Sequence, residues 1–157
     1  VYGEITQITI SPVGKNTVKI PFCIHILNVK QNIKDLNIMI SESQKWNTLE
    51  DYVDYDGKKH NVATTRNIFS SYPKIFLVSF DKKSYVKIDE NLNIGNNVYE
   101  LRSTIIHKGV QYGGHYMSTT KLGDDWIIQD DDTLGKLKQF PSEDNHFILV
   151  YSLKTPS

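Results

Sequence analysis

The chain has a single cysteine, Cys23, among its 157 residues. A disulfide within the chain is therefore excluded, and so is a zinc site built from several thiolates. Because structural disulfides mark oxidising compartments, a chain without them is expected in the cytoplasm or the nucleus.

Long apolar runs and an excess of either charge are also missing. The longest apolar runs, such as residues 75–78, have the length of a strand and are too short to cross a bilayer. The first ten residues lack the basic segment and apolar stretch of a secretory signal. The 18 Lys and Arg residues balance 18 Asp and Glu residues. A neutral chain has no long-range field to attract nucleic acid or an anionic membrane, and we expect neither as a partner.

β-branched and aromatic residues, often in alternation, dominate what remains. They predict strands at residues 7–10, 17–29, 37–41, 74–80, 85–88, 98–107, 116–120, 125–129 and 146–154. Pro21 marks an edge strand or a bulge. Residues 46–55 are the best helix candidate, with Thr48 as the N-cap. We expect one domain over residues 1–157, of the α+β class, mostly antiparallel β-sheet with one or two short helices.

The most informative segment, residues 113–130, reads GGHYMSTTKLGDDWIIQD and continues into Asp131. His115 follows two glycines at the start of a predicted strand. A polar turn leads into a second strand that ends at Asp130, so a hairpin would bring the acids beside the imidazole. A carboxylate fixes the tautomer of a histidine and stabilises its charged form, as in the base half of a nucleophilic catalytic site.

Other chemistries fit less well. A strand histidine is commonly a plain surface residue, and acid runs are commonly solvated turns. The five histidines are scattered without helical pairing, so we predict no metal and no cofactor. Ser118 lies three positions beyond His115 on the same strand, hence on the opposite face, which argues against a Ser/His/Asp hydrolase. Cys23 lacks the helix N-terminus that activates a thiolate, and we interpret it as a half-buried strand residue.

The order of motifs resembles the C-terminal end of the ubiquitin-specific protease catalytic domain, a papain-like cysteine peptidase. That family shows Y-x-L, H-x-G, G-H-Y, a Trp strand, D-D and a closing strand. The matching residues are Tyr99 and Leu101, 105–109 (IIHKG), Gly114 to Tyr116, Trp126, Asp130 and Asp131, and 148–151 (ILVY). Looser matches to the fingers and palm regions lie at residues 2–3, 21–29, 48–55 and 72–88, so the resemblance covers nearly the whole chain.

The resemblance implies roles for individual residues. It implies that His115 is the catalytic histidine, Asp130 the triad acid and Asp131 a neighbouring acid, although a slip of one residue would exchange the two acids. It further implies that the cleft for the Gly-Gly tail of the substrate is lined by Gly113, Gly114 and Tyr116. His107 and Trp126 match positions near the site, and we interpret both as packing residues.

Two family features are missing from the sequence. No segment resembles the family's Cys box, G-L-x-N-x-G-N-T-C-Y, and no C-x-x-C pair is present for a fingers zinc. We therefore expect zinc-free fingers and a palm-and-fingers half without its nucleophile, in a chain that is inactive alone.

Three hypotheses follow from these observations. The chain can be the C-terminal part of a deubiquitinating cysteine peptidase that binds ubiquitin or a ubiquitin-like protein, its cysteine lying on a preceding segment or another chain. It can be a catalytically inactive binding or scaffold module of that family. It can also be a structural or capsid-appended β module with an accidental GGHY pattern.

Overall fold

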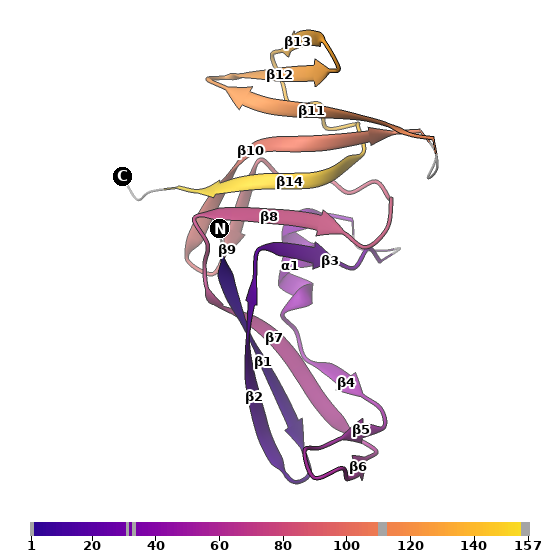
Figure 1. The fold of residues 1–157 in the computed structure, drawn as a ribbon. Helices are drawn as coiled ribbons and strands as arrows, with labels where there is room; N and C mark the ends of the chain where they lie inside the picture. Colours follow the sequence, from indigo (N-terminus) through magenta and orange to yellow (C-terminus); the bar gives the residue numbers. More distant parts are fainter. Residues whose placement is uncertain (1, 31, 33, 110–112, 155–157) are drawn as a thin grey trace.

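The computed structural model describes residues 2–30, 32, 34–109 and 113–154 (Figure 1). Two large sheets and a two-stranded hairpin account for most of these residues, and the described part of the chain has one α-helix. The predicted architecture, mostly antiparallel β with a short helix, is confirmed. That helix has eight residues, and no helix among the described residues is long and apolar enough to span a bilayer.

The eight-stranded sheet, which we call the palm sheet, carries the predicted site. Its strand order is β13 (Thr133–Leu137), β12 (Asp125–Asp130), β11 (His115–Leu122), β10 (Asn97–Lys108), β14 (His146–Leu153), β8 (Ile75–Phe80) and β3 (Ile24–Leu27), with β9 (Asn91–Ile94) paired to β10. Neighbouring strands are antiparallel except β3 and β8, which run parallel.

The four-stranded sheet projects away from the palm sheet, and we call it the fingers sheet (Figure 1). Its order is β2 (Gly14–Phe22), β1 (Gly3–Ser11), β7 (Ala63–Ser71) and β4 (Asn47–Leu49). A small hairpin of β5 (Tyr52–Val53) and β6 (Lys59–His60) lies at the far end of the fingers sheet.

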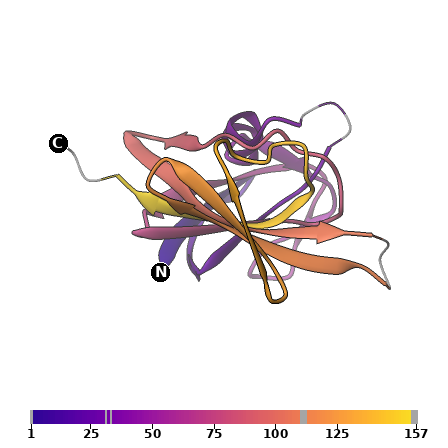
Figure 2. The same ribbon diagram turned by 90° about the horizontal axis from the view of Figure 1, so that it is seen from above.

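One face of the palm sheet builds the hydrophobic core. Phe76 and Val78 on β8 pair with Tyr151 and Leu149 on β14, and all four are fully buried. The helix α1 (Leu36–Ser43) lies on one side of this sheet, as the view from above shows (Figure 2). Because side chains alternate between the two faces of a strand, every second side chain of β8 and β14 points into the core.

The helix is displaced from its predicted position. Residues 37–41, expected as a strand, lie within α1, where the Asp35 carboxylate accepts a hydrogen bond from the Ile38 amide at 3.2 Å. Leu36, Met39 and Ile40 are buried, which is the i, i+3, i+4 spacing of a helix face. The N-cap and the three-residue apolar stripe thus favour a helix over the strand that the short apolar run predicts.

The predicted helix over residues 46–55 is wrong. Its first part forms β4, paired with β7, and its second part forms β5. Asp51, three residues after Thr48, would lie in the first turn of such a helix, but its φ of 52° is outside the right-handed helical region. The tertiary pairing of Asn47 with Thr65 outweighs the local helical pattern.

Two strand predictions also need correction. The long strand expected at residues 17–29 breaks at Cys23, so β2 stays in the fingers sheet while β3 joins the palm sheet. Cys23 is exposed at this bend rather than half-buried within a strand. Residues 85–88 form no strand beside β8, whose partners are β14 and β3; Lys87 instead makes an isolated bridge with Asp35.

An aromatic cluster joins the two sheets at this bend. The His25 ring lies 5.1 Å from Phe69, 6.0 Å from Phe22 and 6.1 Å from Phe76, measured between ring centroids. Burial lowers the pKa of His25 from 6.5 to about 4, because the charged ring would lose its hydration among these groups. His25 is therefore neutral at pH 7.

This low pKa predicts a loss of stability in mild acid. The unfolded chain takes up the His25 proton below pH 6.5, whereas the folded chain resists it down to about pH 4. Neutral His25 therefore makes its full contribution to the free energy of unfolding above pH 6.5. That contribution is lost as the pH falls to about 4, and the loss is about 3 kcal/mol. Urea unfolding at pH 7.5 and pH 4.5 measures the loss. A His25→Phe variant should show a weaker pH dependence, and an unchanged dependence would contradict the assignment.

Candidate active site

The register of β11 with β12 decides which residues meet. Thr119 pairs with Ile128 and Ser118 pairs with Gln129. His115 shares the face of Thr119, and Asp130 shares the face of Ile128. His115 and Asp130 therefore lie on the same face as diagonal neighbours, within reach of long side chains.

His115 and Asp130 are in direct contact. The Nε2 of His115 and the Oδ1 of Asp130 form a hydrogen bond and an ion pair. Because a carboxylate accepts, Nε2–H donates, and Nδ1 is the ring nitrogen left for an incoming group. The side chains are 48% and 46% exposed, so the pair is accessible to solvent and to a substrate.

The acids set the charge of the imidazole. The hydrogen bond to Asp130 and then the negative charge of Asp130 raise the pKa of His115, with a smaller contribution from Asp131. Asp131 follows β12 with a φ of 49°, and its carboxylate belongs to the same cluster. Ligand atoms of His115, Asp130 and Asp131 lie within 4.8 Å of one another, so these are the described residues that could hold a cation. A cation would compete with the His115–Asp130 hydrogen bond.

The residues predicted to bind the substrate tail lie beside His115 in the chain but differ in their exposure and contacts. Gly113 is exposed in the turn before β11. At Gly114 an added Cβ would lie 1.9 Å from Nε2 of His107, so no larger residue fits while His107 keeps its place. Tyr116 is 56% exposed, and its ring packs against the His107 ring at a tilt, with centroids 4.6 Å apart. His107 therefore packs against Gly114 and Tyr116, in agreement with its interpretation as a packing residue. Residues 110–112 lie outside the described residues.

Trp126 is a core residue. It is 2% exposed and packs on Phe140 with ring centroids 4.9 Å apart. The interpretation of Trp126 as a packing residue is confirmed.

A buried network behind the site escaped the sequence analysis. His146 Nε2 donates to the Pro141 carbonyl at 2.7 Å, and His146 Nδ1 lies 2.8 Å from Thr104 Oγ1. Burial lowers the pKa of His146, so the ring is neutral and Nδ1 accepts from Thr104. Thr104 Oγ1 in turn lies 2.6 Å from Thr119 Oγ1. This chain of bonds ties β14, β10 and β11 together, and its members, up to 42 residues apart, carry no local sequence signal.

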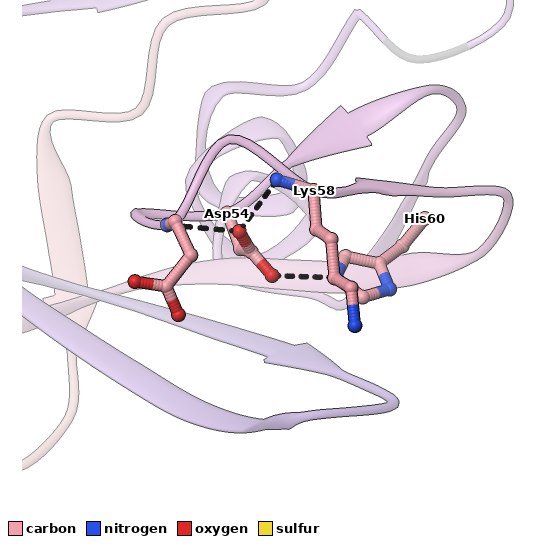
Figure 3. Close-up of polar contacts among 4 residues, drawn as sticks. Asp54, Lys58 and His60 are labelled. Atoms are coloured by element: carbon pink, nitrogen blue, oxygen red, sulfur yellow. Dashed lines mark hydrogen bonds and ion pairs between the residues drawn. The ribbon is translucent and has the colours of Figure 1, made fainter.

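A second His–Asp pair lies at the tip of the fingers (Figure 3). Asp54 Oδ2 accepts from His60 Nε2 at 2.7 Å, and Asp54 Oδ1 accepts from the Asp56 and Lys58 amides at 2.9 Å. The His60 bond and then the Lys58 amide lower the pKa of Asp54. The side chains of His60 and Asp54 are only 10% and 11% exposed. The pair closes the hairpin and is hidden from a substrate, in contrast to His115 and Asp130.

The described fingers residues do not fit a zinc site. Asp54 and His60 converge, but the one group of three possible ligands among the described residues is the palm cluster of His115. Tetrahedral zinc needs four ligands, or three and water.

Cys23 is distant from His115. The order of the palm sheet puts β3, which follows Cys23, four strands away from β11. At about 4.8 Å per strand this separation is about 19 Å. Cys23 therefore cannot donate its proton to His115. A crevice of about 330 Å³ between α1, β3 and β7 has His25 on its wall and contains none of the predicted site residues.

The palm sheet thus presents an exposed histidine that is supported by an acid, and comparisons with known proteins identify the family of the chain. The ubiquitin carboxyl-terminal hydrolase family model matches residues 13–151, and the chain belongs to that family. No curated protein sequence is significantly similar to the chain.

Solved structures share the fold at low sequence identity. The SAGA DUB module containing a substituted Ubp8 bound to monoubiquitin matches with a TM-score of 0.87 and 18% identity, over 99% of this chain and 41% of that chain. The Ubp8 module bound to ubiquitin aldehyde matches with a TM-score of 0.86 and 17% identity, over 99% and 42%. A yeast SAGA DUB module with an altered Sgf73 gives 0.87 and 19%, over 99% and 41%. The chain thus spans about two fifths of the length of these relatives.

The geometry predicts how His115 titrates. Asp130→Asn should bring the pKa of His115 down towards 6.5, because it removes both the charged hydrogen bond and the nearest negative charge. Asp131→Asn is the matched control and should lower the pKa less. Titration of the imidazole signals by NMR measures both. A larger effect of Asp131→Asn would instead make Asp131 the partner of His115.

The close approach at Gly114 predicts a second result. Gly114→Ala should displace the His107 ring and disturb the His115–Asp130 contact, because the new methyl would overlap Nε2 of His107. The double variant Gly114→Ala/His107→Ala has room for the methyl and should restore the raised His115 pKa. Failure of the double variant to recover would show that the backbone, not His107, requires glycine.

Proposed function

We propose that the chain is the C-terminal part of a deubiquitinating cysteine peptidase and supplies the histidine and acid of the catalytic triad. The observation that carries this proposal is the exposed His115–Asp130 pair, in a chain of the ubiquitin carboxyl-terminal hydrolase family. The nucleophile comes from a Cys-bearing segment that precedes this one or belongs to another chain.

Each residue then has a defined task. Asp130 holds Nε2–H of His115, so that Nδ1 takes the proton of the incoming thiol. The thiolate attacks the carbonyl carbon of the last glycine in the Gly-Gly tail, the bond from that carbon to the amine nitrogen breaks, and His115 gives its proton to the leaving amine. Water, deprotonated by His115, then hydrolyses the acyl-enzyme. Gly113, Gly114 and Tyr116 line the cleft for the tail beside His115. Gly113 and Tyr116 are exposed there, and the missing side chain of Gly114 makes room for the His107 ring.

Ubiquitin or a ubiquitin-like protein is the proposed partner. Two structures with the same fold hold monoubiquitin or ubiquitin aldehyde, which supports this choice. The cytoplasm or the nucleus remains the proposed location, on the basis of a single exposed cysteine that has no disulfide partner within the chain.

An inactive ubiquitin-binding module is the second candidate. The distance of Cys23 from the His115 strand favours it for this chain taken alone, because no other thiol is present in the sequence. The two candidates make the same palm-and-fingers surface available and differ in whether a thiol reaches Nδ1 of His115.

A ubiquitin probe with a C-terminal electrophile tests the proposal. The complete protein should be labelled at its triad cysteine, and His115→Ala should slow labelling by at least about 10³-fold, because the thiol loses its base. Cys23→Ser is the matched control and should label at the wild-type rate.

Three outcomes would contradict the catalytic proposal. Labelling that survives His115→Ala would remove His115 from the triad. Binding of unmodified ubiquitin by the complete protein without any labelling would make it the inactive module. A protein that binds neither ubiquitin nor a ubiquitin-like protein would be the structural module.

A further inference from the structure

Within the part of the chain that the structure describes, the strand β2 forms a long outer edge of the fingers sheet. It is the outermost strand in the order β2-β1-β7-β4, and it stands at the side of the fingers (Figure 1). Its nine residues are exposed except for Asn16 and Phe22, which are half-buried. At about 3.3 Å per residue, the edge is about 30 Å long and can pair with a full-length strand.

The turn fixes which backbone groups of β2 face outward. A two-residue turn joins β1 to β2, and its flanking residues Ser11 and Gly14 form a hydrogen-bonded pair. Because such pairs alternate, Lys15, Thr17 and Lys19 direct their N–H and C=O groups away from β1. Pro21 occupies the next outward position, where its missing N–H costs no bond to β1.

The two faces of the edge differ in charge. Lys15 and Lys19 extend to one face, and Val18 and Ile20, which are 36% and 41% exposed, extend to the other. On β1 the residues opposite the lysines are Ile10 and Thr6, so no acid faces them across the ladder. Neither lysine joins an ion pair among the described residues.

This pattern selects one kind of occupant. A second copy of β2, paired antiparallel about Thr17, would place Lys15 against Lys19 twice, and like charges in direct opposition are destabilising. A strand with acids at alternate positions would face both lysines, and its apolar side chains would lie beside Val18 and Ile20. Edge lysines and prolines also protect a sheet against self-pairing, so the same residues reject a copy of the chain and accept an acidic strand.

We propose that β2 is a docking edge for an extended segment of a partner protein in which acidic and apolar residues alternate. The segment adds to the fingers sheet as a fifth strand beside β2, bonded by the outward backbone groups of Lys15, Thr17 and Lys19. This surface lies on the fingers and is independent of the His115–Asp130 pair.

A pair of nine-residue blocked peptides tests the proposal on the complete protein. One peptide alternates Glu with Val, and the other alternates Lys with Val. Titration calorimetry at low salt should show at least tenfold tighter binding of the Glu peptide. The charge-reversed variant Lys15→Glu/Lys19→Glu should prefer the Lys peptide instead. Equal binding of both peptides, or none of the Glu peptide, would overturn the proposal.

A backbone variant separates strand addition from simple charge attraction. Thr17→Pro removes an outward N–H without removing a bond to β1, and it should weaken the Glu peptide at least tenfold. Thr17→Val keeps the N–H and should bind like the wild type. Hydrogen exchange followed by NMR should show protection of the Thr17 amide in the complex, while the palm amides report an intact fold. Wild-type binding by Thr17→Pro would overturn strand addition.

Discussion

The register of the β11–β12 hairpin is the constraint on which the site depends. Because side chains alternate between faces, a slip of one residue in either strand would move its whole set to the opposite face. Trp126 lies on the same face as Asp130 and is almost fully buried. A slip would expose that indole at a cost of at least about 2 kcal/mol. Core packing therefore selects the register that also joins His115 to Asp130.

The sequence was sufficient for this hairpin because its signals are local. Strand alternation and a polar turn with Gly123 at a φ of 62° specify the hairpin within the sixteen residues from His115 to Asp130. The α1 segment and residues 46–55 were interpreted wrongly because short apolar patterns fit both structures, and pairing with the distant strand β7 decided the second. The His146–Thr104–Thr119 network lies beyond any local pattern, since only the folded sheet brings β14, β10 and β11 together.

The His115–Asp130 and His60–Asp54 pairs consist of the same residue types but lie in different surroundings. The surroundings distinguish the candidate active site from a structural contact. Asp54 has three hydrogen-bond donors and little exposure, so its carboxylate is saturated and serves the hairpin. Asp130 is nearly half exposed and holds a single ring nitrogen of His115, which leaves the other nitrogen for chemistry. The fingers have no thiolates that could bind a zinc ion, and the hydrogen bonds to Asp54 hold the hairpin at their tip together.

The pKa of His115 is raised, whereas the pKa values of His25 and His146 are lowered. A change of pH therefore affects both the charge of the candidate site and the stability of the fold. Acid protonates His115 readily because Asp130 raises its pKa, and the protonated ring strengthens the ion pair. Acid disfavours the folded state at His25 and His146, whose pKa values are lowered by burial. In its proposed role as a base His115 must be unprotonated, so both effects favour a working pH above the pKa of His115. In that range the neutral His25 cluster keeps the fingers joined to the palm, and Nδ1 of His115 is free to accept a proton.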